Sequence, residues 1–187
     1  MYPISFSASL KSDDVTIQSR KGRKIVPKQA YIVELKKNGN DLKSLYNLSL
    51  LWNKEGKNLV PYLLSDFIKD IDEKPDVNDE HCFALTLQDS DFENIKPEKI
   101  LGVSLFSEED IENEINWLQV QPKNNSIFEP ANREYEDVGT AIVDYLKAQY
   151  AGKSMYANVS AGAIDFYRKQ GFKSYDKKFP CSMYFKV

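Results

Sequence analysis

Hydrophobic and polar residues alternate over the first part of the chain with the period of two that β-strands produce. The alternation covers residues 2–10, 14–19, 23–27 and 30–36, and Lys21 and Gly22 predict a hairpin turn between the middle two segments. After residue 40 the spacing becomes helical, and two helices are expected before residue 72. The second of them carries one apolar face, made of Leu64, Phe67, Ile68 and Ile71.

The second half of the chain alternates between strand patterns and helix patterns. Residues 81–87 and 99–106 are typical of an antiparallel meander, and residues 115–121 of a further strand. A helix is expected from about residue 138 to 151, followed by a strand over KSMYANV that a crossover makes parallel to residues 115–121. Ser160 can cap a short helix that ends at Gly171, and two antiparallel strands then complete the chain.

The composition predicts one soluble domain, residues 1–187, with 42% hydrophobic and 28% charged residues. The net charge of −3 argues against general affinity for nucleic acid or membranes. We expect neither a signal peptide nor a membrane span, because no apolar run reaches about 18 residues. Cys82, Cys181 and His81 are too few for a structural zinc site, so no metal is expected. Reduced thiols in a cytoplasmic location are the default expectation.

Three segments carry the most specific patterns, WLQVQP, VGTAIVDYL and AGAIDFYRKQGF. They resemble the fourth strand, the start of the cofactor helix and the A-x-x-F-Y-x-x-x-G-F pattern of the GNAT superfamily, the acyl-CoA-dependent N-acetyltransferases. The resemblance is most specific over residues 115–172 and extends in element order from about residue 30 to 187, with 1–29 as an N-terminal strand and hairpin extension. It implies an α/β (α+β) fold with a twisted, mostly antiparallel mixed sheet, a splayed parallel central strand pair and about four helices.

The helix that begins at residue 138 is the expected binding place for the diphosphate of acetyl-CoA, the acyl donor that the resemblance implies. A helix N-terminus leaves N–H groups unpaired and carries partial positive charge. The resemblance also implies that an extended pantetheine arm pairs with the exposed edge of the preceding strand. The expected cofactor-binding residues are Leu118, Gln119, Val120, Val138, Gly139, Thr140, Ala141 and Ser160, the last at the family's usual asparagine. Alternatively, Gly139 only permits close packing of the helix on the sheet.

The resemblance implies transfer of an acetyl group to a primary amine of a small molecule or a peptide, without a metal. Tyr167 is the expected general acid, because a phenol with a pKa of about 10 suits a thiolate leaving group. Glu114 is the expected general base, and Glu112 is the alternative. Tyr167 also fits a core position, and both glutamates also fit ordinary surface charge.

Two carboxylates depart from the family's phosphate loop, which reads Q/R-x-x-G-x-G/A. Matching its last position to Gly139 places Glu134 at the basic or amide position and Asp137 at the first glycine. Both oppose diphosphate binding, and Asp137 can itself cap the helix, whereas Arg133 and Lys123 are candidates for compensation. The alternative function is therefore a GNAT-fold binding or regulatory protein that has lost catalysis.

A basic cluster at the predicted hairpin turn consists of Arg20, Lys21, Arg23, Lys24 and Lys28. It fits a contact for phosphate or an acidic partner, and it equally fits a charged hairpin tip that prevents edge pairing. A third and weaker hypothesis is nucleic-acid association through this cluster. The sequence leaves the acceptor and the oligomeric state open, a homodimer included.

Overall fold

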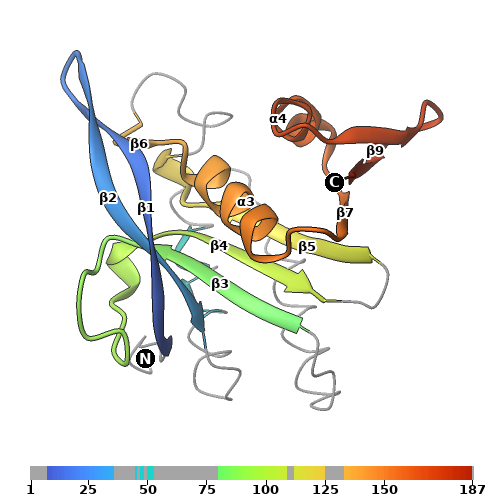
Figure 1. Ribbon diagram of the computed structural model, residues 1–187. Helices are drawn as coiled ribbons and strands as arrows, with labels where there is room; N and C mark the ends of the chain where they lie inside the picture. Colours follow the sequence, from blue (N-terminus) through green and yellow to red (C-terminus); the bar gives the residue numbers. More distant parts are fainter. Residues whose placement is uncertain are drawn as a thin grey trace.

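The computed structural model describes residues 8–35, 45, 47–48, 50–52, 80–108, 112–124 and 133–186 (Figure 1). Within this part of the chain, nine strands form one sheet in the order β6-β1-β2-β3-β4-β5-β7-β9-β8. The strands are β1 (Ala8–Lys21), β2 (Lys24–Leu35), β3 (Glu80–Thr86), β4 (Ile100–Ser107), β5 (Glu112–Val120), β6 (Tyr135–Glu136), β7 (Ser154–Asn158), β8 (Lys173–Asp176) and β9 (Phe179–Phe185). Neighbouring strands are antiparallel except β5 and β7, which are parallel, so the predicted mixed sheet with one parallel pair is confirmed.

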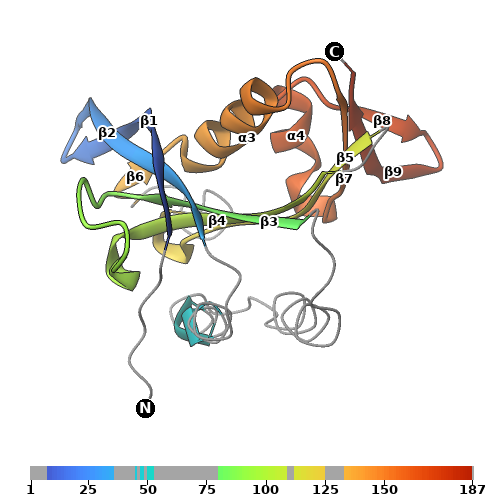
Figure 2. The same cartoon turned by 60° about the horizontal axis from the view of Figure 1, so that its bottom comes forward.

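Helical segments cover both faces of the sheet (Figure 2). Two helices, α3 (Val138–Gln149) and α4 (Ile164–Lys169), lie over one face. The 3₁₀ turns are η1 (Pro97–Lys99), η2 (Pro122–Asn124) and η3 (Ala161–Ala163). On the opposite face the helical residues Leu45, Leu48 and Trp52 are buried against β2, β3 and β4. Their spacing is that of the first predicted helix, whereas the second predicted helix lies outside the described residues.

The face under α3 holds the larger core because apolar side chains recur along one side of that helix. Val138, Ile142, Val143 and Leu146 are buried there against residues of β3, β4 and β5. Burying each such side chain stabilises the fold by about 1.5–3 kcal/mol. The helix ends at Gln149, two residues before the predicted end, and Gly152 follows with φ of +96°.

The first half of the sheet is built on one long hairpin, in which β1 and β2 pair from Lys21↔Lys24 to Ala8↔Leu35. The turn falls where it was predicted, and Gly22 there adopts φ of +62°, which glycine tolerates without a steric penalty. The four short strands predicted here are thus two long ones. The predicted strand residues before Ala8 lie outside the described part of the chain.

The end of α4 follows the sequence prediction closely. Gly171 adopts φ of +86°, and the N–H of Phe172 donates to the carbonyl of Tyr167 at 3.0 Å. This 6→1 bond is that of a Schellman motif, and it turns Phe172 back into the core. No helix among the described residues is both long and apolar enough to span a membrane.

Candidate functional site

The parallel strands β5 and β7 separate in the middle of the sheet. They pair from Glu112↔Ser154 to Ile115↔Ala157, after which β7 ends at Asn158 while β5 continues to Val120. The register between β4 and β5 shifts at the same point, since Phe106 pairs with Ile115 but Leu105 pairs with Trp117. Such a bulge bends and twists its strand. Among the described strands none pairs with residues 116–120 of β5 on the β7 side, and this unpaired edge is called the opening below.

The main chain of β5 presents hydrogen-bonding groups to this opening. The N–H of Gln121 donates to the carbonyl of Leu101 at 2.8 Å, so alternate residues along β5 face β4. By this alternation Gln119 directs its main-chain groups toward β4, whereas Leu118 and Val120 direct theirs toward the opening. Of the three strand residues expected to hold an extended ligand, Leu118 and Val120 therefore have the required orientation. Gln119 is committed to the sheet.

The start of α3 lies next to Val120, and its first amides have no acceptor within the helix. The first intrahelical bond runs from the N–H of Ala141 to the carbonyl of Asp137, at 2.8 Å. Three of the four expected amide donors, those of Val138, Gly139 and Thr140, therefore precede the helical ladder. The N–H of Ala141, the fourth expected donor, already bonds within the helix.

Asp137 does not cap the helix with its side chain. It is exposed, makes no side-chain cap hydrogen bond and adopts the left-handed conformation, with φ of 63° and ψ of 13°. Non-glycine residues rarely adopt this conformation, which asparagine and aspartate tolerate best. Asp137 thus takes a backbone conformation that glycine adopts most easily, and its carboxylate makes no cap hydrogen bond to the first-turn amides.

Gly139 faces the core and not the solvent. A methyl group on it would lie 3.2 Å from Cζ of Phe166 in α4 and 3.5 Å from Cγ2 of Val120 in β5. The glycine therefore permits close packing of α3 on both elements, which is the packing role left open by the sequence. Phe166, which sequence reasoning did not single out, lies with Val120 against the start of α3.

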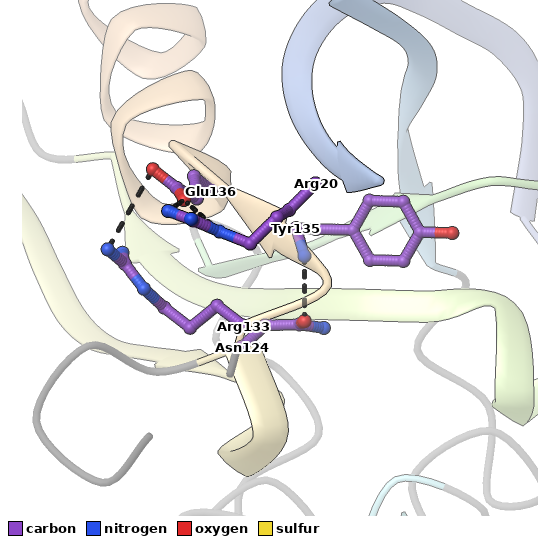
Figure 3. Close-up of polar contacts among 5 residues, drawn as sticks. All are labelled: Arg20, Asn124, Arg133, Tyr135 and Glu136. Atoms are coloured by element: carbon purple, nitrogen blue, oxygen red, sulfur yellow. Dashed lines mark hydrogen bonds and ion pairs between the residues drawn. The ribbon is translucent and has the colours of Figure 1, made fainter. Parts of the chain in front are cut away.

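The loop before α3 is organised around Glu136 (Figure 3). Nε of Arg20 donates to Oε1 of Glu136 at 3.0 Å, and Nη2 of Arg20 contacts the same oxygen. Nη2 of Arg133 lies 3.8 Å from Oε2 of Glu136, and Nε of Arg133 is buried and has no hydrogen-bond partner within the described part of the chain. Arg133 thus keeps an unused donor close to the start of α3.

The remaining charges of this loop are more exposed. Nζ of Lys123 lies 4.0 Å from Oε2 of Glu134, and both side chains are about half exposed to solvent. The segment 133–137, with Arg20 and Lys123, therefore combines three cationic and three anionic side chains, namely Arg20, Lys123, Arg133, Glu134, Glu136 and Asp137. The carboxylates are balanced locally, which the sequence indicated only for Lys123 and Arg133.

Tyr167 is the buried residue of α4, with 6% of its surface exposed. Its ring packs edge-on against Phe166 and Phe172, with ring centroids 5.1 and 5.2 Å apart. Desolvation by this burial raises the pKa of the phenol well above its usual value. The hydroxyl therefore stays protonated through the physiological range and remains a proton donor.

The two expected catalytic residues lie on opposite faces of the sheet. Ile115 and Ala157 belong to the same core as Tyr167, so Glu114 and its strand partner Tyr156 face the other side. Glu114 is half-buried and lies one residue before the last parallel pair, whereas Glu112 is exposed and lies at the far end of that pairing. The structure thus places Glu114 nearer than Glu112 to the opening.

Ser160 is the N-cap residue of η3, as predicted, with an extended backbone; its side chain makes no cap hydrogen bond, so only its carbonyl, which accepts the N–H of Ala163 at 2.9 Å, serves this end. The α-helix α4 begins later, at Ile164.

In the basic cluster of the hairpin turn, Arg20 binds Glu136, while Lys21, Arg23, Lys24 and Lys28 are exposed. Among the described residues no group of three His, Cys, Asp or Glu side chains is arranged to hold a metal ion.

Comparison with known proteins connects this architecture to one group. No protein-family model matches the chain, and no curated protein matches it in sequence. Among solved structures, an acetyltransferase from Thermus thermophilus gives a TM-score of 0.55 at 15% identity, over 82% of this chain and 94% of that one. The PaiA N-acetyltransferase from Thermoplasma acidophilum, in complex with coenzyme A, gives 0.51 at 16% identity, over 83% and 99%. A Desulfovibrio desulfuricans protein assigned to the GNAT family gives 0.51 at 12% identity, over 84% and 98%.

These likenesses extend over most of both chains, at identities of 12–16%. At identities this low the structural likeness shows the fold alone, and the fold of this chain is the GNAT fold.

Proposed function

We propose that the protein transfers the acetyl group of acetyl-CoA to a primary amine. The observation that carries the proposal is the separation of β5 from β7 beyond Ile115↔Ala157, beside a helix whose first amides have no helical acceptor. An opening next to uncovered N–H groups suits a long, extended ligand with a diphosphate. The solved PaiA enzyme, which shares the fold, was obtained with coenzyme A.

The residues present fit such a ligand. The amides of Val138, Gly139 and Thr140 would receive the diphosphate, and the spare Nε donor of Arg133 would add a charged contact. The pantetheine arm would pair with the main chain of Leu118 and Val120, as an added strand does. Arg133 would thus replace the basic or amide side chain that the phosphate-loop pattern expects at position 134, where this chain has Glu134.

The proposed chemistry is direct attack of the amine on the thioester carbonyl, in which a C–N bond forms and the C–S bond breaks. Tyr167 gives its proton to the departing thiolate. Its raised pKa keeps the proton in place before reaction, and the same apolar surroundings make a desolvated thiolate more basic. Glu114 takes the proton that the amine loses.

The acceptor would approach from the face opposite α3 and α4. Glu114 and Tyr156 lie on that face, and the hydroxyl of Tyr156 donates to Oδ1 of Asn158 at 2.9 Å. Because β5 and β7 separate just beyond these residues, a carbonyl held in the opening would be reachable from both faces of the sheet. A carboxylate on the acceptor side favours a cationic amine substrate.

Calorimetric titration with acetyl-CoA tests the proposal, with Asp137→Asn as the informative variant. Asparagine tolerates the left-handed backbone and removes the charge nearest the proposed diphosphate. We expect Asp137→Asn to bind acetyl-CoA about three- to tenfold more tightly at low salt, the effect of one partly screened charge. Asp144→Asn, the same change on an exposed face of α3, is the matched control and should bind as the wild type does.

A rival function is favoured by one observation, the exposed carboxylates of Glu134 and Asp137 beside the first turn of α3. In that case the fold serves binding or regulation without the acyl donor. Absence of acetyl-CoA binding by both the wild type and Asp137→Asn would support the rival and reject transferase activity.

A further inference from the structure

The long β1–β2 hairpin reaches the loop that precedes α3. The two-residue strand β6 pairs with the outer edge of β1, through Gln18↔Glu136 and Ser19↔Tyr135. The N–H of Arg20 extends this pairing by donating to the carbonyl of Glu134 at 2.8 Å. Figure 1 shows β6 beside the upper part of the hairpin and directly before α3. The hairpin therefore contacts the backbone that sets where α3 begins.

A side-chain contact reinforces the pairing. The guanidinium of Arg20 holds Oε1 of Glu136 through Nε and Nη2, and the carboxylate is 17% exposed. Glu136 immediately precedes Asp137, the residue in the left-handed conformation. Partial burial makes such a charged bond stronger than a surface ion pair.

A second contact fixes the same loop from the other side. Oδ1 of Asn124 accepts the N–H of Tyr135 at 3.0 Å, and Nδ2 of Asn124 donates to Oε1 of Gln121 at 3.0 Å. Asn124 is 4% exposed, and Gln121 is bound to β4 through its main chain. Tyr135 is thus held between the end of β5 and the edge of β1 (Figure 3).

The carboxylate of Glu136 also determines whether the guanidinium of Arg133 can bind a ligand. Oε1 of Glu136 is taken by Arg20, and Oε2 lies 3.8 Å from Nη2 of Arg133, which is an ion-pair distance and not a hydrogen bond. Without Arg20, both oxygens of Glu136 would be free to bind Arg133. By occupying Glu136, Arg20 therefore leaves Arg133 less tightly bound to that carboxylate. It also holds the backbone just before the first-turn amides of α3 in place.

We propose that Arg20 is a positioning residue for the acyl-donor site, and that the N-terminal hairpin is part of this site. The inference rests on the proposed function for the identity of the ligand. Arg20 acts through Glu136 and does not touch the ligand. This gives residues 18–20 of β1 a role, which is to hold the loop 134–137 so that α3 presents its amides toward the opening.

The test compares Arg20→Gln with Arg23→Gln, which makes the same change at an exposed position of the same hairpin. Amide hydrogen exchange of residues 134–140 without ligand should become faster in Arg20→Gln and stay unchanged in Arg23→Gln. Acetyl-CoA affinity should fall about three- to tenfold in Arg20→Gln, with partial recovery in Arg20→Lys, which keeps one charged bond. Unchanged exchange together with unchanged affinity in Arg20→Gln would overturn the inference and leave the proposed function standing.

Two further results separate the possibilities. If Arg20 acts through Glu136, then Arg20→Gln should alter acetyl-CoA affinity by less than about twofold in a Glu136→Gln background. An equal loss in both backgrounds would instead make Arg20 a direct charge on the ligand and overturn the positioning role. If the wild type binds no acetyl-CoA while amide exchange of residues 134–140 still becomes faster in Arg20→Gln, the proposed function fails. The positioning of the loop 134–137 by Arg20 is then supported by itself.

Discussion

Replacing Gly102 by alanine should push α3 away from the sheet. A methyl group at this position of β4 would lie 2.9 Å from Cδ1 of Ile142, 3.0 Å from Cγ1 of Val138 and 3.4 Å from the carbonyl oxygen of Gln119. Carbon atoms in well-packed cores lie about 3.5–4.0 Å apart, so both α3 side chains must move by more than half an ångström or so. Val138 is the first residue of α3, and the displacement therefore reaches the amides of the proposed diphosphate site.

The magnitude follows from two opposing effects. Overpacking of this kind costs about 1–3 kcal/mol, and replacing glycine within a strand returns about 0.5–1 kcal/mol of backbone entropy. The difference of these ranges is about 0–2.5 kcal/mol, and because two α3 side chains must move we expect its upper part, a loss of about 1–2.5 kcal/mol in the free energy of unfolding and about 2–10 °C in Tm for a domain of this size. Thermal unfolding followed by circular dichroism measures the change.

A second variant tests whether the loss comes from the contact with Ile142. Ile142→Val removes the Cδ1 atom and alone costs about 0.5–1.5 kcal/mol. Because it makes room for the new methyl group, the double variant should be more stable than the sum of the two losses predicts, by at least about 0.5 kcal/mol. Wild-type stability of Gly102→Ala, or strict additivity in the double variant, would refute this account of α3 packing.

Three other predictions concern catalysis and pH. Tyr167→Phe should lower kcat by about 10²–10⁴-fold with little change in acetyl-CoA affinity, and unchanged turnover would remove the tyrosine as general acid. Glu114→Gln should lower kcat at least about tenfold while Glu112→Gln, its matched control, leaves kcat unchanged; the reverse result would transfer the role of base to Glu112. Burial and then the charges of Glu108 and Glu34 raise the pKa of Tyr150 to about 12, so stability should fall as pH rises from 10 toward 12, where the unfolded chain loses this proton first. Tyr150→Phe should flatten that decline in a Tm-versus-pH series, and an unchanged slope would contradict it.

The local features of the fold could be predicted from the sequence. The period of two marks the strands of the hairpin and the meander, and the apolar stripe from Val138 to Leu146 marks α3. The segment FYRKQGF marks α4 and its end at Gly171, because a helix end depends on residues a few positions apart. The same segment led to the GNAT fold, which the solved structures confirm.

Tertiary structure alone decided how these elements share the site. One register shift beside Trp117 sets where β5 separates from β7, and strand alternation then places Glu114 and Tyr167 on opposite faces. The contact between Arg20 and Glu136 joins residues 116 positions apart. In the sequence, each of the two residues alone is typical of ordinary surface charge. Periodicity and capping signals act over a few residues and therefore appear in the sequence. The curvature that brings the first hairpin to the loop before α3 is a property of the whole sheet, so it appears only when the chain is folded.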